Sequence, residues 1–289
     1  MTTYQLDVDE FWREGVCWPV NRVNVDGLAD HFFEVQRAAV ERRGREVHIS
    51  PHLISTDIDA LVHDPMILDE VEKLLGPDFV MWESDFARKP PGGTDWVPWH
   101  SDAPYWNLST NEVVSVWVAL TDVTVANAAM QVVPRTHLRP DIARLDYDED
   151  PMVGYRKGIR TSSEGNAFNY DTIIADDVDP DRDAVAVELR SGQFSIHHVD
   201  LLHGGGPNTS ELDRIGFAMR YMSSRTHCRT GTDSVMEMRG DASTEHFVFE
   251  PRPSSSFSEE AWAAFETAMT YPSGFGDRTI TAAPSEADG

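Results

Sequence analysis

The sequence predicts a mostly β protein, a barrel or sandwich flanked by helices, and two observations support this fold class. Within residues 7–75 the apolar side chains recur at helical spacing between capping residues. From Phe79 onward they alternate with period two, and turn residues separate the runs. Helices followed by many short strands with long connections are typical of this architecture.

Local signals then predict the elements in order. Helices are expected at 7–15, 26–44, 69–75 and 257–271, from acidic caps, terminal glycines and amphipathic spacing. Strands are expected at 79–89, 113–121, 129–133, 184–189, 193–199 and 214–222. The acidic segment 135–182 has little periodicity, which is typical of a lid-like insertion.

The chain has 289 residues, which is enough for one domain with a full hydrophobic core. We therefore expect a single domain over 1–289. Its parts would be a mainly helical segment (1–78), a β core that contains the insertion (79–223), and a C-terminal extension with a closing helix (224–289).

The charge balance is strongly acidic. The chain has 24 Lys and Arg residues against 49 Asp and Glu residues, a net charge of −25. Such a surface repels nucleic-acid phosphates and anionic lipids, so we expect neither as a partner. Two cysteines, no basic and apolar leader, and no apolar run of roughly 20 residues favour a cytoplasmic protein. The oligomeric state stays open.

The stretch TDWVPWHSDAPYW, residues 94–106, carries a candidate metal site. His100 and Asp102 are two residues apart, so on a strand their side chains would leave from one face and reach one metal. An imidazole and a carboxylate suit Fe(II) or Mn(II), and a second, distant His would complete a facial triad with open coordination positions.

His203 is the best candidate for the distant ligand. It follows an apolar strand and directly precedes Gly204-Gly205-Gly206, where we expect the backbone to turn sharply beside the ligand. His197 and His198 compete with it, but neither precedes a glycine turn.

Arg214 lies 11 residues after His203, at the start of the next strand. An antiparallel return would bring its guanidinium beside the metal, and Arg is the side chain that binds a carboxylate in a bidentate manner. Small residues, Gly216 and Ala218, share its face and would leave a slot for a dicarboxylate. The bulky residues of the strand would pack on the other face.

These motifs resemble the phytanoyl-CoA dioxygenase family of iron- and 2-oxoglutarate-dependent oxygenases. The resemblance covers most of the chain, and it rests on WHSDAPYW (99–106), VVSVWVALTDV (113–123), NAAMQVVPRTH (127–137) and LLHGGGPNTSELDR (201–214). It implies a double-stranded β-helix, a jelly-roll of the cupin type.

The resemblance also implies a set of site residues. Iron would be held by His100, Asp102 and His203. The remote carboxylate of 2-oxoglutarate would lie on Arg214, with Trp117 and Lys89 as further cosubstrate contacts. Trp106, four residues after the Asp, would face the substrate.

Other substrate contacts are predicted from the residues themselves. Glu83 and Asp85 share a face of their strand and could receive an amine or another cation. Arg220 could hold a substrate carboxylate or pair with an acid of the protein. Tyr105 and Gln131 complete the candidates.

The expected cofactors are Fe(II), 2-oxoglutarate and O2. The expected reaction is hydroxylation of an unactivated C–H bond in a small amino-acid-like molecule or an intermediate of secondary metabolism, with release of succinate and CO2. Halogenating relatives have a small residue at the position of Asp102, so the carboxylate here favours hydroxylation.

Two alternatives from other classes remain. Two His and one Asp also suit Zn²⁺, as in a zinc-dependent hydrolase on a β-barrel. A non-catalytic barrel that binds a small molecule is the other.

Overall fold

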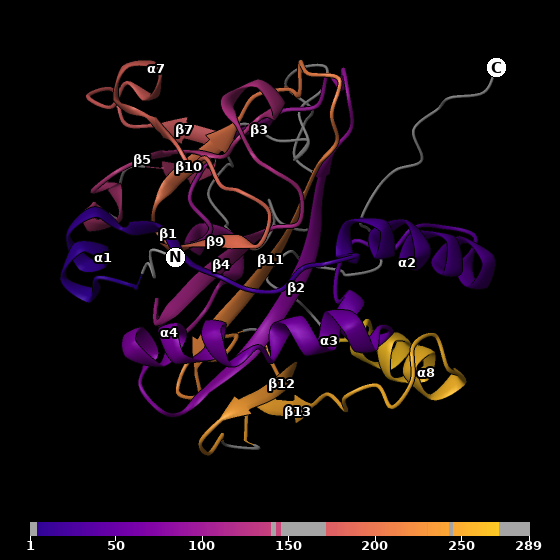
Figure 1. Cartoon of the computed structure of the whole chain (residues 1–289). Coiled ribbons are helices and arrows are strands. Elements are labelled where there is room, and N and C mark those ends of the chain that lie inside the picture. The colour runs from indigo at the N-terminus through magenta and orange to yellow at the C-terminus, as the bar shows by residue number, and fades with distance from the viewer. Residues whose placement is uncertain (1–4, 140–142, 146–171, 230, 243–244, 272–289) are drawn as a thin grey trace.

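The computed structural model describes residues 5–139, 143–145, 172–229, 231–242 and 245–271. Two facing sheets form its core (Figure 1). The larger sheet has the strand order β1-β9-β4-β11-β2-β12-β13, and the smaller has the order β3-β10-β5-β8. Neighbouring strands are antiparallel in both sheets, except that β12 and β13 are parallel. This arrangement is the expected jelly-roll.

The strands of the larger sheet are β1 (Val16–Arg22), β9 (Gln193–His198), β4 (Val113–Ala119), β11 (Arg214–Ser223), β2 (Phe79–Lys89), β12 (Asp233–Arg239) and β13 (Phe247–Phe249). Those of the smaller sheet are β3 (Val97–His100), β10 (Leu202–Gly205), β5 (Gln131–Val133) and β8 (Val185–Ala186). A separate pair joins β6 (Ala143–Leu145) and β7 (Thr172–Ile174). The predicted strands are all present, whereas β1, β6, β7, β12 and β13 lie where the sequence indicated none.

The helices are α1 (Val8–Glu14), α2 (Leu28–Arg43), α3 (Thr56–Val62), α4 (Pro65–Leu75), α5 (Ala103–Trp106), α7 (Pro180–Asp183) and α8 (Glu259–Ala268). Short 3-10 turns lie at Pro51–Leu53, Val125–Asn127 and Thr136–Leu138. Of the two acidic caps predicted for α1, Asp7 and Asp9, the structure has Asp7: its carboxylate accepts a hydrogen bond from the Glu10 amide at 2.9 Å. Helix α3 was not predicted, and α4 begins earlier than expected because Asp64 caps it and Pro65 opens it.

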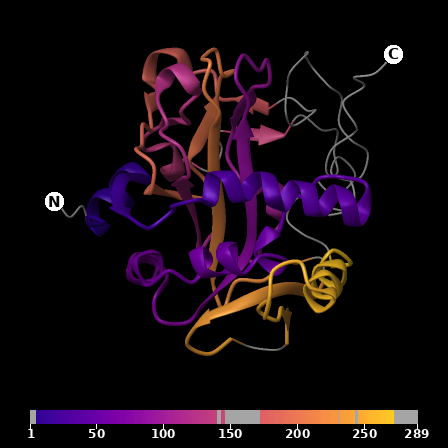
Figure 2. The same ribbon diagram turned by 45° about the vertical axis from the view of Figure 1, so that its right-hand side comes forward.

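Helices α2, α3, α4 and α8 pack on the outer side of the larger sheet (Figures 1 and 2). Helix α4 contacts β4 and β11. The main hydrophobic core joins apolar side chains of α2, α3, α4 and α8 with the outer residues of β11, which are Ile215, Phe217, Met219 and Tyr221. The predicted alternation of β11 is therefore confirmed, and its inner face carries Arg214, Gly216, Ala218 and Arg220 toward the smaller sheet.

The inner face of β2 differs from the prediction. Simple alternation places Val80 and Trp82 opposite Glu83, but the register between β11 and β2 shifts at this point. Arg220 pairs with Glu83 and Tyr221 with Met81, so one extra residue forms a β-bulge. As a result Val80 and Trp82 pack in an inner cluster with Trp106, on the same face as Glu83.

Most of the predicted insertion 135–182 lies outside the described residues, and its lid-like role stays a prediction. Within the described ranges, no helix has the length and apolar character needed to cross a lipid bilayer.

Candidate metal centre

Two histidines face each other across the smaller sheet. His203 on β10 lies directly opposite His100 on β3 in the antiparallel register, and their ring centroids are 4.1 Å apart. The expected sharp turn after His203 is absent, because Gly204 and Gly205 continue the strand. A Cβ on Gly204 would lie 3.2 Å from the carbonyl oxygen of Val97, so glycine here permits close approach of the two strands.

The backbone position of Asp102 differs from the prediction. Strand β3 ends at His100, and Asp102 has helical backbone angles at the start of α5. Its amide donates to the carbonyl oxygen of Val199 at 2.9 Å, which holds this turn against the chain leading to β10. The prediction that both residues share one strand is therefore wrong, although their side chains do converge.

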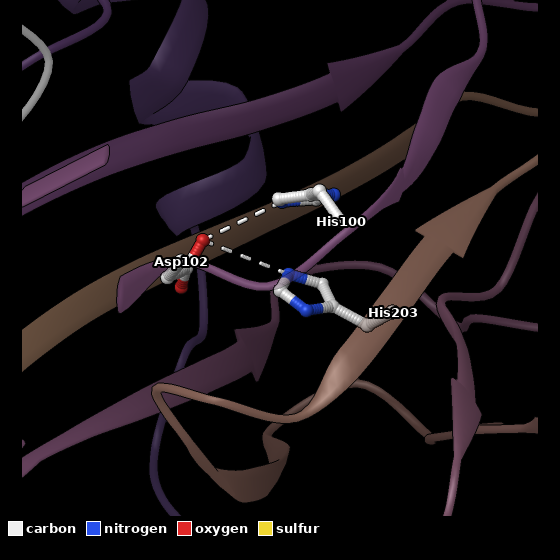
Figure 3. A group of neighbouring side chains, drawn as sticks. All are labelled: His100, Asp102 and His203. Carbon is white, nitrogen blue, oxygen red and sulfur yellow. Dashed lines mark ion pairs between the residues drawn. The ribbon is translucent and has the colours of Figure 1, made fainter. Parts of the chain in front are cut away.

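The donor atoms of the three residues point toward one another (Figure 3). Asp102 Oδ1 is 3.4 Å from Nε2 of His100 and 3.9 Å from Nε2 of His203. One ligand atom from each residue lies within 4.8 Å of the others, and no second such group occurs in the part of the chain that is described.

Backbone carbonyls fix the ring orientation of both histidines. Nδ1 of His100 donates to the carbonyl oxygen of Pro98 at 2.8 Å, and Nδ1 of His203 donates to that of Leu201 at 2.9 Å. A proton on Nδ1 leaves the lone pair on Nε2, the nitrogen that faces Asp102. Both rings are thus oriented as metal ligands.

The electrostatics of the group also suit a divalent cation. Burial and the neighbouring His100 lower the pKa of His203 to about 3, so its ring is neutral. Burial tends to raise the pKa of Asp102, but the neighbouring imidazoles, His100 first among them, outweigh it, so the net pKa is lowered. Two neutral imidazoles and one carboxylate are the donor set of non-haem iron(II) sites.

The two rival histidines have different surroundings. The ring of His197 lies 5.0 Å from that of His203, beside the group but not within it. His198 leaves β9 on the other face and packs against Trp12 and His137.

Two of the predicted cosubstrate contacts, Arg214 and Lys89, form a pair of buried cations on the inner face of the larger sheet. Arg214 on β11 is the register partner of Lys89 on β2, and both side chains are buried. Arg214 donates to the carbonyl oxygens of Ala128 and Ala87, while Nε of Arg214 has no hydrogen-bond partner within the described residues. Lys89 donates to the carbonyl oxygens of Gly205 and Gly206, beyond His203.

Burial and the charge of Arg214 lower the pKa of Lys89 to about 7, and burial lowers that of Arg214 to about 10. Two desolvated cations side by side are costly without an anion. This pair is therefore suited to the remote carboxylate of 2-oxoglutarate.

Trp117 on β4 completes this end of the site. Its ring lies 5.5 Å from the guanidinium carbon of Arg214, within cation–π range. The slot predicted beside Arg214 is filled, because a Cβ on Gly216 would overlap the Trp117 ring. The small residues of β11 thus accommodate an indole.

We expect Gly216→Ala to displace Trp117 and so to weaken 2-oxoglutarate binding. Overpacking of this kind costs about 1–3 kcal/mol in unfolding free energy. Chemical denaturation and equilibrium binding of 2-oxoglutarate measure the two effects. Gly206→Ala is a matched control, since nothing lies within 4 Å of its Cβ position. An equal effect of both substitutions would contradict the steric account.

The structure brings some of the predicted substrate contacts together. Arg220 pairs in register with Glu83 and forms an ion pair with Asp85. Trp106 is buried against Trp82, with a centroid distance of 5.2 Å, and lies 5.9 Å from the Arg220 guanidinium carbon.

Two other candidates are not brought to the site. Gln131 is the register partner of Gly204, one position from the Val132–His203 pair, so its side chain leaves the opposite face of β5. The side chain of Tyr105 lies outside the described part of the structure.

Sequence reasoning missed two inner-face residues, Ser115 on β4 and Ser195 on β9. Both are buried, and neither hydroxyl has a hydrogen-bond partner within the described residues. No motif marks them, and only their alternation with bulky apolar neighbours could have placed them on the inner face.

Comparison with known proteins agrees with this geometry. The family model of phytanoyl-CoA dioxygenase matches residues 21–216. A probable alpha-ketoglutarate-dependent hypophosphite dioxygenase of Stutzerimonas stutzeri is 28% identical over 64% of this chain and 61% of its own length. The peroxisomal phytanoyl-CoA dioxygenase of Rattus norvegicus is 26% identical over 55% of this chain and 44% of its own. The chain thus spans less than two thirds of either relative.

Among solved structures, a non-heme monooxygenase, ThoJ, is 30% identical with a TM-score of 0.75, over 95% of this chain and 96% of that one. The expected jelly-roll fold is confirmed by this likeness. The chain belongs to the phytanoyl-CoA dioxygenase family, whose members are iron- and 2-oxoglutarate-dependent oxygenases, as the sequence motifs predicted.

Proposed function

We propose that this protein hydroxylates a C–H bond of a small organic molecule, with His100, Asp102 and His203 as the iron ligands and Arg214 as the anchor of 2-oxoglutarate. The observation that carries the proposal is the convergence of the three donor atoms within 4.8 Å, on the same barrel interior as a buried cation pair. When bound, iron and 2-oxoglutarate supply the oxidising chemistry, with O2 consumed and succinate and CO2 released.

The side chains of the site would have separate roles in binding the metal and 2-oxoglutarate. The three ligands would occupy one face of the metal, leaving the other face for the keto-acid end of 2-oxoglutarate and for O2. Arg214 would bind the remote carboxylate through its guanidinium, with Lys89 adding a second positive charge and Trp117 bounding the pocket. The buried walls exclude water and hold the cosubstrate in one orientation.

Asp102 favours hydroxylation over halogenation. Its carboxylate is directed at the two imidazoles, where it would take the coordination position that a halide needs. A chlorinated product formed in the presence of chloride would contradict this assignment.

The two rival functions leave the cation pair unexplained. A zinc hydrolase needs the triad but not two buried cations side by side, and a non-catalytic barrel does not need the triad. We therefore favour the oxygenase over both.

Anaerobic titration of the apo-protein with Fe(II) and 2-oxoglutarate tests the proposal. We expect the visible metal-to-ligand charge-transfer band of a chelated 2-oxo acid, and we expect that Asp102→Ala will lack it. Zn(II) in place of Fe(II) should give no band and no O2 uptake. Hydrolytic activity with zinc and no band with iron would support the hydrolase instead.

A further inference from the structure

Two buried hydroxyls lie on the inner face of the larger sheet, beside the residues that are proposed to bind 2-oxoglutarate. Ser195 on β9 is the register partner of Trp117 on β4. Ser115 precedes Trp117 by two positions, so it shares the inner face of β4. The Trp117 ring also lies 5.5 Å from the guanidinium carbon of Arg214. Trp117 therefore lies between Arg214 and the two serines.

The two serines also adjoin the proposed metal centre. Ser115 pairs in register with His197 on β9, and the ring of His197 lies 5.0 Å from that of His203. Ser195 precedes His197 by two positions and shares its face of β9. Both hydroxyls thus occupy the part of the inner face between the Arg214 end and the proposed iron ligand His203.

Neither hydroxyl is paired within the part of the chain that the structure describes. Ser195 is fully buried and Ser115 is 2% exposed, and Oγ of each has no hydrogen-bond partner there. Every residue of β4 is buried, so an apolar side chain at position 115 would pack without leaving a polar atom unpaired. An unpaired buried hydroxyl costs free energy, and such exceptions are typical of sites that bind a ligand or an ordered water.

The spacing of the two serines suits a single carboxylate. Diagonal neighbours on one face of an antiparallel strand pair are about 7–8 Å apart, and their Cβ atoms are somewhat closer. Ser115 and Ser195 are diagonal neighbours, because Ser195 lies opposite Trp117. Each hydroxyl can donate one hydrogen bond, and a carboxylate has two oxygens that accept. One carboxylate between the two serines would therefore satisfy both hydroxyls.

The two ends of this inner face match the two ends of 2-oxoglutarate. Arg214 and Lys89 supply basic side chains where the remote carboxylate is proposed to lie. At the other end, a divalent cation on the triad would offset the charge of the second carboxylate, so neutral donors are enough to orient it. Ser115 and Ser195 provide donors there without adding a charge.

We infer that Ser115 and Ser195 bind the 2-oxo-acid end of 2-oxoglutarate, by donating hydrogen bonds to its C1 carboxylate. This inference rests on the proposed function, because it takes 2-oxoglutarate as the molecule bound between Arg214 and the metal. The two hydroxyls fix the orientation of the 2-oxo acid at the metal, and Arg214 fixes the opposite end. The cosubstrate is thereby held at three places along the inner face of the larger sheet.

The test compares Ser115→Ala and Ser195→Ala with the unmodified protein, each loaded anaerobically with Fe(II). Titration with 2-oxoglutarate, followed by the charge-transfer band, measures the dissociation constant. We expect each substitution to weaken binding at least about tenfold, because one hydrogen bond to a charged group is lost. The band maximum should also move, because the carboxylate at the metal loses a donor.

Chemical denaturation of the apo-protein separates binding from packing. Ser115→Ala and Ser195→Ala each remove a buried hydroxyl that has no described partner, so the unfolding free energy of the apo-protein should stay the same or rise. A fall in that free energy that accounts for the weaker binding, with an unmoved band maximum, would give the two serines a packing role and overturn the inference.

Ser50→Ala is the matched control. Its hydroxyl is also buried without a partner among the described residues, but the Ser50 amide donates to the carbonyl oxygen of Ser84 on β2, away from the inner face. Ser84 pairs in register with Met219, which packs in the outer core. Ser50→Ala should bind 2-oxoglutarate as the unmodified protein does.

The outcomes separate this inference from the proposed function. If the unmodified protein shows the band, and both Ser115→Ala and Ser195→Ala keep its affinity and its band maximum, the hydroxyls bind only water and the inference fails alone. If the unmodified protein shows no band with Fe(II) and 2-oxoglutarate, the proposed function fails and the inference fails with it.

Discussion

His203→Ala is expected to lower Fe(II) affinity by more than about 100-fold and to abolish succinate formation. Loss of a residue that merely supports a ligand already costs about 10–100-fold, and His203 would contribute one of only three protein donors. Its Nε2 lies 3.9 Å from Asp102 Oδ1, where the carbonyl of Leu201 holds the ring. Anaerobic equilibrium dialysis of iron measures the loss directly.

His197→Ala is the control for this experiment. His197 lies beside His203 but outside the group of converging donor atoms, so this variant should retain most of its iron. Iron lost from His197→Ala and kept by His203→Ala would reverse the assignment of the distal ligand.

Arg214→Ala should weaken 2-oxoglutarate binding by about 100- to 4,000-fold while leaving iron affinity nearly unchanged. Removing one partner of a buried ion pair costs about 3–5 kcal/mol, because the remaining carboxylate is buried without its counter-charge. Arg214→Lys should recover little, since an ammonium cannot reproduce the planar guanidinium that stacks near Trp117. Titration of the iron-loaded protein with 2-oxoglutarate measures the dissociation constant.

Arg22→Ala provides a matched control, as it removes an exposed guanidinium from the edge strand β1. It should bind 2-oxoglutarate as the unmodified protein does. If Arg214→Ala binds 2-oxoglutarate as tightly as the unmodified protein does, the pair of Arg214 and Lys89 has another role.

Local signals predicted the elements that depend on short-range physics. The Asp7 cap and the helix ending at Gly15 are read from neighbouring residues, and the inner and outer faces of β11 follow from strict alternation. Such features are set by the backbone within about ten residues. The antiparallel return predicted from His203 to Arg214 is wrong, because β10 lies in the smaller sheet and β11 in the larger one.

Features that depend on pairing between distant strands were not predictable. The β-bulge that turns Trp82 to the inner face exists only in the register of β2 against β11. The sequence does not indicate that Gly216 makes room for the ring of Trp117, because β4 and β11 are neighbours only in the folded sheet. The turn after β3 that contains Asp102 also depends on a distant residue, because the Asp102 amide donates a hydrogen bond to the carbonyl oxygen of Val199.

The most direct test of the central claim is a crystal structure of the protein grown anaerobically with Fe(II) and 2-oxoglutarate, with anomalous scattering recorded at the iron edge. The proposal predicts one strong peak, about 2.0–2.2 Å from Nε2 of His100, an Oδ atom of Asp102 and Nε2 of His203. Density for the cosubstrate should reach from that peak to Arg214. A peak held by other residues, or one from which Asp102 is turned away, would contradict the account.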